Sequence, residues 1–210
     1  MTCHIIEATI EIIEELRKII RDCDIVICTT DNKASRLLIN RICVEENVKC
    51  IFSGAFTRAY GGQVMVVRPH ETMCLQCFYM HNPGLAKEEE VSNKRQLEQF
   101  GQYADRPVHI EPGLSIDISN LSSMTARIAL QMLLEGKETS LDTLSEDLVA
   151  SWYVWINRRE KGTQYEGLEP LEYNVDGFHI LRWYGIKIDR HPECPVCGNF
   201  IEAMKEKYGI

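Results

Sequence analysis

Four cysteines, arranged as two pairs far apart in the chain, place the strongest constraint on how this sequence can fold. Cys74 and Cys77 lie in ETMCLQCFYM, and Cys194 and Cys197 lie in HPECPVCGNF. Two cysteines separated by two residues can turn both sulfurs toward one ion, and two such pairs supply the four thiolates of a closed tetrahedral zinc site. We name each pair a knuckle and predict that both bind one structural zinc ion.

The spacing of the two knuckles determines what this ion does to the fold. The first ends at Cys77 and the second begins at Cys194. This separation is far longer than the one between the two ligand pairs of a zinc finger. The zinc ion would therefore join two distant segments, and His191 is a candidate to support it. Two other interpretations are unrelated pairs of buried cysteines and redox-active dithiols, of which the second is weaker because the pairs lack a thioredoxin-like context.

Composition indicates the compartment and excludes some partners. The 210 residues include nine cysteines but no signal peptide and no apolar stretch long enough to cross a bilayer. We therefore expect a cytoplasmic protein whose cysteines are thiols or metal ligands rather than disulfides. The formal net charge of −8 argues against non-specific nucleic-acid binding, and we expect neither a nucleic-acid nor a membrane partner.

Hydrophobic periodicity predicts an α/β fold for the first part of the chain. Apolar residues recur every three or four positions over 7–22, which predicts a helix, and DIVICTT (24–30) predicts a strand that is buried on both faces. A helix over 31–47 and a strand over 49–53 follow. Helix and strand therefore alternate, as they do along an open parallel sheet.

The remaining segments change this pattern. Gly61 and Gly62 lie between two strand-like runs and predict a hairpin turn, so we expect an antiparallel extension of the sheet. Residues 78–112 are polar and charged and predict a long surface loop. A helix is predicted over 119–136, and residues 151–210 are expected to form a C-terminal β segment that carries the second knuckle.

Asp31 and Asn32, in CTTDNKASR, directly follow the first predicted strand. In open α/β sheets, ligands bind outside the carboxyl ends of the strands. A carboxylate in this place can hold Mg²⁺, and an asparagine can bond a ribose or a phosphate. The residues alone favour the simpler alternative, which is that Asp31 only caps the following helix.

Taken in order, these motifs resemble the ThiF/MoeB/ubiquitin-activating enzyme (E1-like) superfamily. The resemblance is carried by DIVICTTDNKASRLLIN, IFSGAFTRAYGGQVMVVRP, CLQC and CPVCG. It implies a partial Rossmann-like sheet, mixed parallel and antiparallel, and ATP-dependent adenylation of the C-terminal glycine of a ubiquitin-like or sulfur-carrier protein. It also implies structural zinc, ATP and magnesium as cofactors, and a homodimer or a partner chain.

The resemblance assigns roles to residues of this chain. Asp31 matches the family's Mg²⁺–nucleotide aspartate and is the catalytic candidate, and Asn32 lies beside it in the nucleotide pocket. Arg36 matches an arginine of the following helix, where it supports the site. The knuckle cysteines match the family's structural zinc ligands, and 78–112 matches the crossover loop that covers the carrier's tail.

Two departures limit what the resemblance implies. The family's G-x-G-x-x-G phosphate loop has no counterpart here, so we expect residues 1–210 to be a single ThiF-type domain that is incomplete at its N-terminus. No cysteine lies between Cys77 and Cys194, which makes adenylation without a thioester, as in MoeB, the closer model. The alternative function is a non-catalytic, zinc-stabilised module that binds a carrier protein or a partner subunit. A nicotinamide oxidoreductase is disfavoured because the dinucleotide fingerprint is missing.

Overall fold

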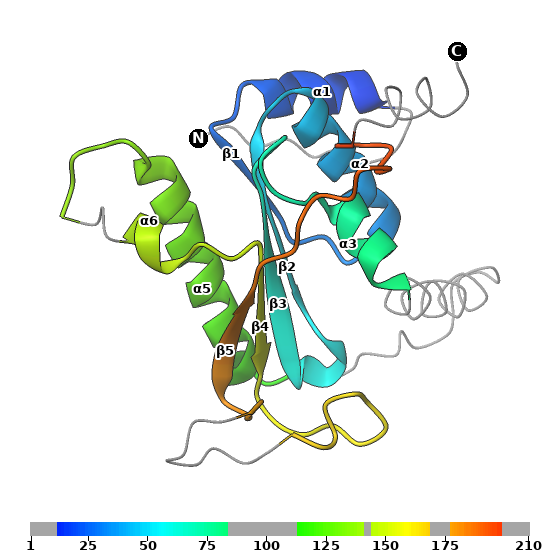
Figure 1. Ribbon diagram of the computed structural model, residues 1–210, viewed down its shortest axis with the longest axis vertical. Coiled ribbons are helices and arrows are strands. Elements are labelled where there is room, and N and C mark those ends of the chain that lie inside the picture. Colours follow the sequence, from blue (N-terminus) through cyan, green and yellow to red (C-terminus); the bar gives the residue numbers. More distant parts are fainter. Residues whose placement is uncertain (1–11, 84–112, 141–143, 169–176, 199–210) are drawn as a thin grey trace, which may run out of the picture. The chain divides into compact units, whose positions relative to one another are not determined.

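The computed structural model describes residues 12–83, 113–140, 144–168 and 177–198. In chain order its elements are α1 (Ile13–Arg21), β1 (Ile25–Cys28), α2 (Lys33–Glu45), β2 (Lys49–Ala55), the 3₁₀ helix η2 (Thr57–Ala59), β3 (Gly61–Val67), α3 (Leu75–His81), α5 (Ser115–Leu134), α6 (Leu144–Asp147), β4 (Trp152–Ile156) and β5 (Arg182–Ile186). The strands are hydrogen-bonded in the order β1-β2-β3-β4-β5 (Figure 1). The predicted α/β class is confirmed, with a sheet that mixes parallel and antiparallel strands.

The chain forms two compact units. The first unit comprises Met1–Cys50, Val67–Ala104 and Asp189–Ile210, and the second unit comprises Ile51–Val66 and Asp105–Ile188. Helices α1, α2 and α3, strand β1 and both knuckles belong to the first unit. The second unit contains α5, α6, β4, β5 and most of β2 and β3.

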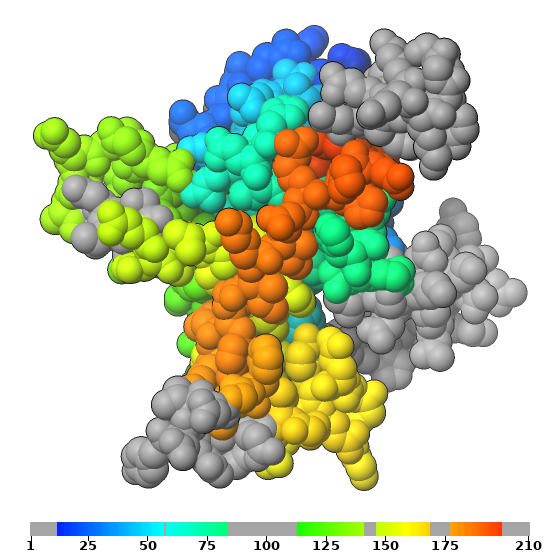
Figure 2. Space-filling view, in the orientation of Figure 1, coloured from blue at the N-terminus to red at the C-terminus, as the bar shows by residue number. Residues whose placement is uncertain are grey.

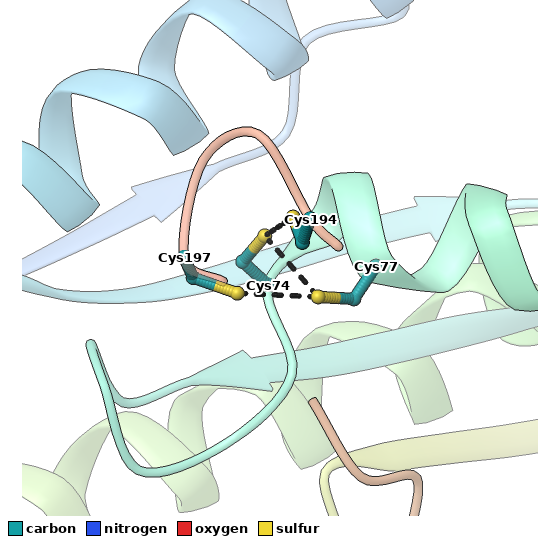
Figure 3. A group of neighbouring side chains, drawn as sticks. All are labelled: Cys74, Cys77, Cys194 and Cys197. Carbon is teal, nitrogen blue, oxygen red and sulfur yellow. Dashed lines mark hydrogen bonds between the residues drawn. The ribbon is translucent and has the colours of Figure 1, made fainter. Parts of the chain in front are cut away.

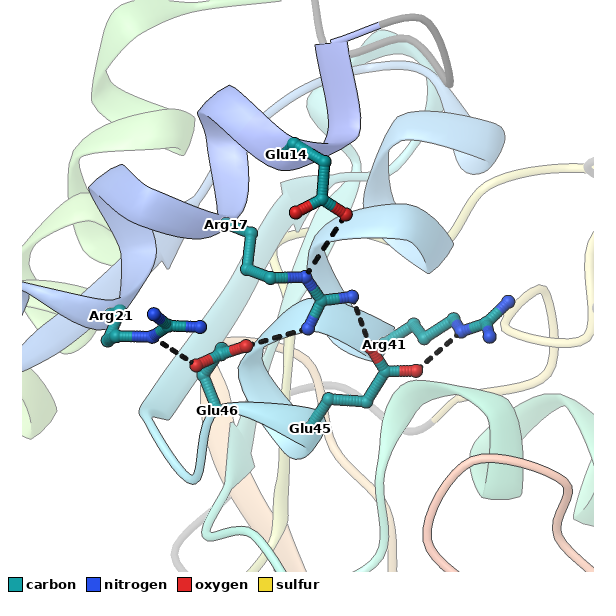
Figure 4. Close-up of polar contacts among 6 residues, drawn as sticks. All are labelled: Glu14, Arg17, Arg21, Arg41, Glu45 and Glu46. Atoms are coloured by element: carbon teal, nitrogen blue, oxygen red, sulfur yellow. Dashed lines mark hydrogen bonds and ion pairs between the residues drawn. The ribbon is translucent and has the colours of Figure 1, made fainter.

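Helices α1 and α2 of the first unit are joined by a network of ion pairs (Figure 4). The Arg17 guanidinium lies 2.6 Å from a Glu45 carboxylate oxygen and 2.7 Å from one of Glu46, and Arg21 lies 2.6 Å from the other oxygen of Glu46. Hydrogen bonds from Arg21 and Arg17 lower the pKa of Glu46 to about 2. Helix α2 also buries Ile42 completely, so its C-terminal turns combine ion pairs with apolar burial.

In the second unit, β4 lies between β3 and β5 and is antiparallel to both. The register places Trp155 opposite Trp183, and the centroids of their rings lie 5.6 Å apart. Helix α5 contacts this unit's sheet through Thr125, whose hydroxyl donates a hydrogen bond to Ser53 Oγ at 2.8 Å. Both hydroxyl groups are buried, so the hydrogen bond satisfies two polar groups that water does not reach.

The prediction of a hairpin turn at Gly61 and Gly62 is wrong. Both glycines lie inside strand β3, and the chain turns earlier, through η2. A Cβ atom at Gly61 would lie 2.4 Å from the Trp155 carbonyl oxygen, and one at Gly62 would lie 2.9 Å from a methyl group of Leu121. The two glycines therefore permit close approach of β4 and α5 to β3. In the sequence, a glycine pair with this packing role looks the same as a glycine pair in a turn.

Strand β1 is less buried than its sequence predicts. Only Cys28 is buried, whereas the side chain of Ile27 is 46% exposed. The strand stands at the end of the strand order, so it pairs with a neighbouring strand on one side only. The prediction that this strand is buried on both faces is therefore wrong for Ile27.

The helices differ from their predicted bounds at their ends. The described part of the predicted helix over 7–22 is α1, and α5 begins one turn before the predicted helix over 119–136. The start of the predicted loop over 78–112 continues α3 as far as His81, and residues 84–112 lie outside the described residues. None of the described helices combines the length and the hydropathy that a membrane span requires.

Candidate metal centre and nucleotide-binding residues

The fold brings the sulfurs of both knuckles together within the first unit (Figure 3). All four Sγ atoms lie within 4.8 Å of one another. Cys74 Sγ lies 3.8 Å from Cys77 Sγ and 3.6 Å from Cys194 Sγ, and Cys77 Sγ lies 3.1 Å from Cys197 Sγ. Because all four residues are at most 3% exposed, the two pairs form one cluster that is closed to solvent.

Short backbone hydrogen bonds shape each knuckle. In the first, Phe78 N donates to the Cys74 carbonyl at 3.1 Å as α3 begins. In the second, Gly198 N donates to the Cys194 carbonyl at 2.9 Å, and a Cβ atom at Gly198 would lie 2.5 Å from the Pro192 carbonyl oxygen. The second knuckle therefore requires glycine at position 198, because any side chain would force the turn open.

Residues next to the second knuckle hold it against the first. The backbone N–H of His191 donates to Cys77 Sγ at 3.3 Å, so His191 contacts the cluster through its main chain. The Arg190 guanidinium donates to the His70 carbonyl at 2.7 Å and to the Cys197 carbonyl. In the space-filling view the red-orange segment around the second knuckle lies against the green end of α3 (Figure 2). Arg190 was not predicted, since nothing in its sequence position distinguishes it from a surface arginine.

The geometry of the cluster fits a zinc ion. Tetrahedral ligands with Zn–S bonds of about 2.3 Å are separated by about 3.8 Å, and the measured separations of 3.6 Å and 3.8 Å agree with that value. The separation of 3.1 Å between Cys77 Sγ and Cys197 Sγ is shorter than that value. Four thiolates leave no coordination position for water or substrate, so an ion in this place would be structural.

The charge of the cluster also favours a cation. Hydrogen bonds from Cys197, Cys74 and Cys77 lower the pKa of Cys194. The pKa of Cys74 is raised, mainly by its hydrogen bond with Cys194. Without a cation, charge on one sulfur therefore makes charge on its neighbours unfavourable, whereas a divalent ion stabilises all the thiolates together.

Asp31 and Asn32 lie at the carboxyl end of β1, where the chain enters α2. Asn32 is the N-cap of α2, and its side-chain oxygen accepts hydrogen bonds from Ala34 N at 2.8 Å and Ser35 N at 3.3 Å. The alternative that Asp31 caps this helix is therefore wrong. The Asp31 side chain is exposed, and no hydrogen bond or ion pair joins its carboxylate to another described residue.

Arg36 contacts the turn between β1 and α2. Its Nε donates to the Thr30 carbonyl at 2.5 Å, and Ser35 Oγ donates to the Thr30 hydroxyl at 2.9 Å. These two contacts fix the residue that precedes Asp31. They are the contacts that a supporting residue makes, and the role of Arg36 in a nucleotide site stays a prediction.

The strand end offers few ligands to a Mg²⁺ ion. Magnesium is usually bound by one or two carboxylates together with phosphate oxygens and water. Asp31 offers one exposed carboxylate, and the side-chain oxygen of Asn32 is occupied by its capping bonds. Only the Asn32 amide N–H groups remain to bond a ligand, so phosphates and water would have to complete the coordination of a metal held by Asp31.

Asn40 is a second residue that the sequence did not predict. It lies on α2, is fully buried, and its Oδ1 accepts a hydrogen bond from Leu75 N at 2.9 Å. Lys33 joins the same two helices, because its Nζ lies 4.5 Å from the centroid of the Tyr79 ring on α3. Asn40 is the one uncharged polar residue in LLINRIC, and this is the signal that could have identified it.

Comparison with protein families gives a match over most of the chain. A family model described as the ThiF family matches residues 2–151. Ubiquitin-like modifier-activating enzyme 5 of Drosophila grimshawi is 30% identical over 136 residues, which cover 65% of this chain and 31% of that protein. The chain therefore spans about a third of the length of this curated relative.

Comparison with solved structures gives the same fold. Escherichia coli MccB solved with MccA has a TM-score of 0.53 at 16% identity, over 91% of this chain and 44% of that chain. E. coli MccB solved with ATP has a TM-score of 0.50 at 14% identity, over 89% of this chain and 42% of that chain. At this identity the likeness concerns the fold alone, and this chain spans less than half of each MccB chain.

Proposed function

Because the chain belongs to the ThiF family, we propose that it forms the Mg²⁺-binding strand end and the zinc-stapled part of an ATP-dependent adenylating enzyme. The substrate is the C-terminal carboxylate of a carrier protein or peptide that ends in glycine. One carboxylate oxygen attacks the α-phosphorus of ATP, the bond to the β-phosphate breaks, and pyrophosphate leaves. The product is an acyl adenylate, so ATP supplies both the leaving group and the driving force.

The single observation that carries this proposal is the free carboxylate of Asp31. It follows β1 at the position where open α/β sheets bind ligands. The structure does not use it to cap α2, because Asn32 does so. An exposed carboxylate without a partner among the described residues, beside a helix start held by Arg36, is available to hold Mg²⁺ on the phosphates.

The relatives support the class of reaction and of partner. One is an activating enzyme for a ubiquitin-like modifier, and E. coli MccB has been solved both with ATP and with MccA. We infer the same kind of partners for this chain, namely a nucleotide and a polypeptide. The zinc ion would hold the second knuckle on the first and take no part in the chemical step, because four thiolates complete its coordination.

Pyrophosphate exchange tests the proposal. The full-length protein, supplied with Mg-ATP and a carrier that ends in Gly-Gly, should exchange labelled pyrophosphate into ATP. Asp31→Asn should lower the exchange rate by about 100-fold, because it removes the charge that holds the metal. Asp24→Asn is the matched control, since Asp24 is an exposed aspartate that precedes the same strand, and it should leave the rate within about twofold of wild type.

Two outcomes would contradict the proposal. One is an exchange rate in Asp31→Asn that equals the rate in Asp24→Asn, which would remove Asp31 from the reaction. The other is specific binding of the carrier without any exchange, which would favour a non-catalytic, zinc-stabilised binding module.

A further inference from the structure

Asn40 contacts the first knuckle from a different helix. Its side chain is 0% exposed, and its Oδ1 lies 2.9 Å from the backbone nitrogen of Leu75. Leu75 directly follows Cys74 and is the first residue of α3. The hydrogen bond therefore reaches the main chain inside the Cys-Leu-Gln-Cys segment that presents Cys74 and Cys77.

This hydrogen bond supplies a cap that the knuckle lacks. The first backbone N–H groups of a helix have no partner within the helix, and a side chain at the N-cap usually accepts from one of them. Cys74 occupies the N-cap of α3 and makes no such bond with its side chain. Asn40 takes over the function from α2, which leaves the sulfur of Cys74 free to face the cluster.

The amide nitrogen of Asn40 bears on why this buried residue is an asparagine. Its Nδ2 is buried and has no hydrogen-bond partner among the described residues. A buried amide with half of its bonding capacity unused destabilises a core, and an apolar side chain of similar size would avoid that cost. The place of an asparagine at this position is therefore explained by the hydrogen bond to Leu75 and not by packing.

We propose that Asn40 is a positioning residue of the metal centre, which fixes the first knuckle so that its two sulfurs meet those of Cys194 and Cys197. The inference rests on the proposed zinc site, and it adds a residue outside the cysteine motif to that site. A fixed knuckle keeps the four sulfurs close to their metal-bound positions when one Zn–S bond opens. Removal of the hydrogen bond therefore speeds the loss of the ion, even when the chain stays folded.

The test measures zinc release from the purified, zinc-loaded full-length chain to an excess of the chelator 4-(2-pyridylazo)resorcinol. Asn40→Leu keeps the size of the side chain and removes the acceptor, and we expect it to release zinc about tenfold faster than wild type. Ile42→Ala is the matched control, because Ile42 is equally buried on α2. It should lower the melting temperature but leave the release rate within about twofold of wild type.

Hydrogen exchange of the zinc-loaded protein gives a second readout, which follows the backbone instead of the metal. The Leu75 amide should exchange faster in Asn40→Leu than in wild type. It should stay protected in Asn40→Asp, whose carboxylate still accepts the hydrogen bond. If Asn40→Leu does not fold, Asn40→Ala compared with Asn40→Asp provides the same contrast.

The outcomes separate this inference from the proposal on which it rests. Equal release rates in wild type and Asn40→Leu, or equal acceleration by Ile42→Ala, would overturn the role of Asn40 and leave the zinc site intact. A wild-type chain that binds no zinc at all would overturn both.

Discussion

The thiolate cluster and the carboxyl end of β1 are built in opposite ways. The cluster joins sulfurs 120 positions apart in the chain, and its cysteines are at most 3% exposed. The strand end depends on contacts between residues at most six positions apart, from Thr30 to Arg36, and its acidic group is exposed. The sulfurs of the cluster thus meet only when distant segments of the first unit fold together, whereas the strand end is ordered by local contacts and leaves its carboxylate exposed.

Helix α2 belongs to both regions. It begins at the Asn32 cap beside Asp31, and Asn40 on the same helix contacts the first knuckle. We therefore expect substitutions in α2 and its neighbours to have effects of two kinds. Substitutions at the cluster should change metal content and global stability, whereas substitutions at the strand end should change nucleotide chemistry and leave the metal in place.

The largest effect is expected when a metal ligand is removed. Cys194→Ser should reduce bound zinc from one ion per chain to nearly none. It should destabilise the first unit by about 3 kcal/mol or more, because the binding energy of a structural metal is folding energy. This loss corresponds to a melting temperature roughly 6–12 °C lower. Zinc content by mass spectrometry and thermal melting check both parts.

Cys43→Ala is the control for this substitution. Cys43 is a fully buried thiol on α2 outside the cluster, so its replacement should lower stability and retain one zinc ion. Retention of zinc by Cys194→Ser would show that the second knuckle is not part of the metal site.

The next effect concerns the cap at the strand end. Asn32→Ala removes both capping hydrogen bonds and should destabilise the protein by about 1 kcal/mol, with zinc content unchanged. Asn120→Ala is the control, because Asn120 is an exposed asparagine inside helix α5, and this substitution should be neutral or slightly stabilising. Loss of zinc in Asn32→Ala would show that the two regions are not separable. Chemical denaturation with a parallel zinc assay measures both quantities.

A smaller, pH-dependent effect is expected from the ion pairs between α1 and α2. Because the pKa of Glu46 is lowered to about 2 by hydrogen bonds from Arg21 and Arg17, its carboxylate stabilises the folded state fully above its ordinary pKa of 4.5. The contribution is lost as the pH falls from 4.5 toward 2. Glu46→Gln should therefore be less stable than wild type at pH 7, and the difference should shrink below pH 4.5.

Thermal melts of wild type and Glu46→Gln across this pH range test the prediction. Glu15→Gln serves as the control, since Glu15 is exposed on α1 and takes no part in the ion pairs of Figure 4. A difference between wild type and Glu46→Gln that grows at low pH would contradict the lowered pKa of Glu46.

The smallest effect on stability is expected at Asp31 itself. Asp31→Asn should change the free energy of unfolding by less than about 0.5 kcal/mol and leave the zinc content at one, because the carboxylate has no partner among the described residues. The same variant should lose pyrophosphate exchange. A stability loss above about 1 kcal/mol would mean that the fold uses this carboxylate and that it is not free for a metal.

The sequence predicted the parts of this account whose chemistry is local. Two cysteines separated by two residues identify a knuckle without knowledge of the fold. Asp31 and Asn32 are recognisable because they directly follow a predicted strand. Apart from the pairing of the two knuckles, the sequence did not predict features that depend on partners far away in the chain. The roles of Asn40 and Arg190 depend on their hydrogen bonds to Leu75 and Cys197, and only the fold brings these residues together.

The two glycines of β3 illustrate the same limit. Gly61 and Gly62 have the composition of a turn, but their structural reason is the approach of Trp155 and Leu121, which lie more than fifty positions later. The exposure of Ile27 has a similar origin, because an apolar strand sequence does not reveal how many elements will cover it. A sequence pattern indicates which secondary structure a segment prefers, whereas the residues that pack against the segment are known only from the fold.

Cobalt substitution tests the central claim, that the four cysteines form a closed tetrahedral metal site. The wild-type chain should bind one Co²⁺ ion and show the visible spectrum of tetrahedral cobalt with four thiolates. That spectrum should stay unchanged when Mg-ATP or imidazole is added, because no coordination position is open. A wild-type chain that binds no metal, or a spectrum that changes with added imidazole, would contradict the claim.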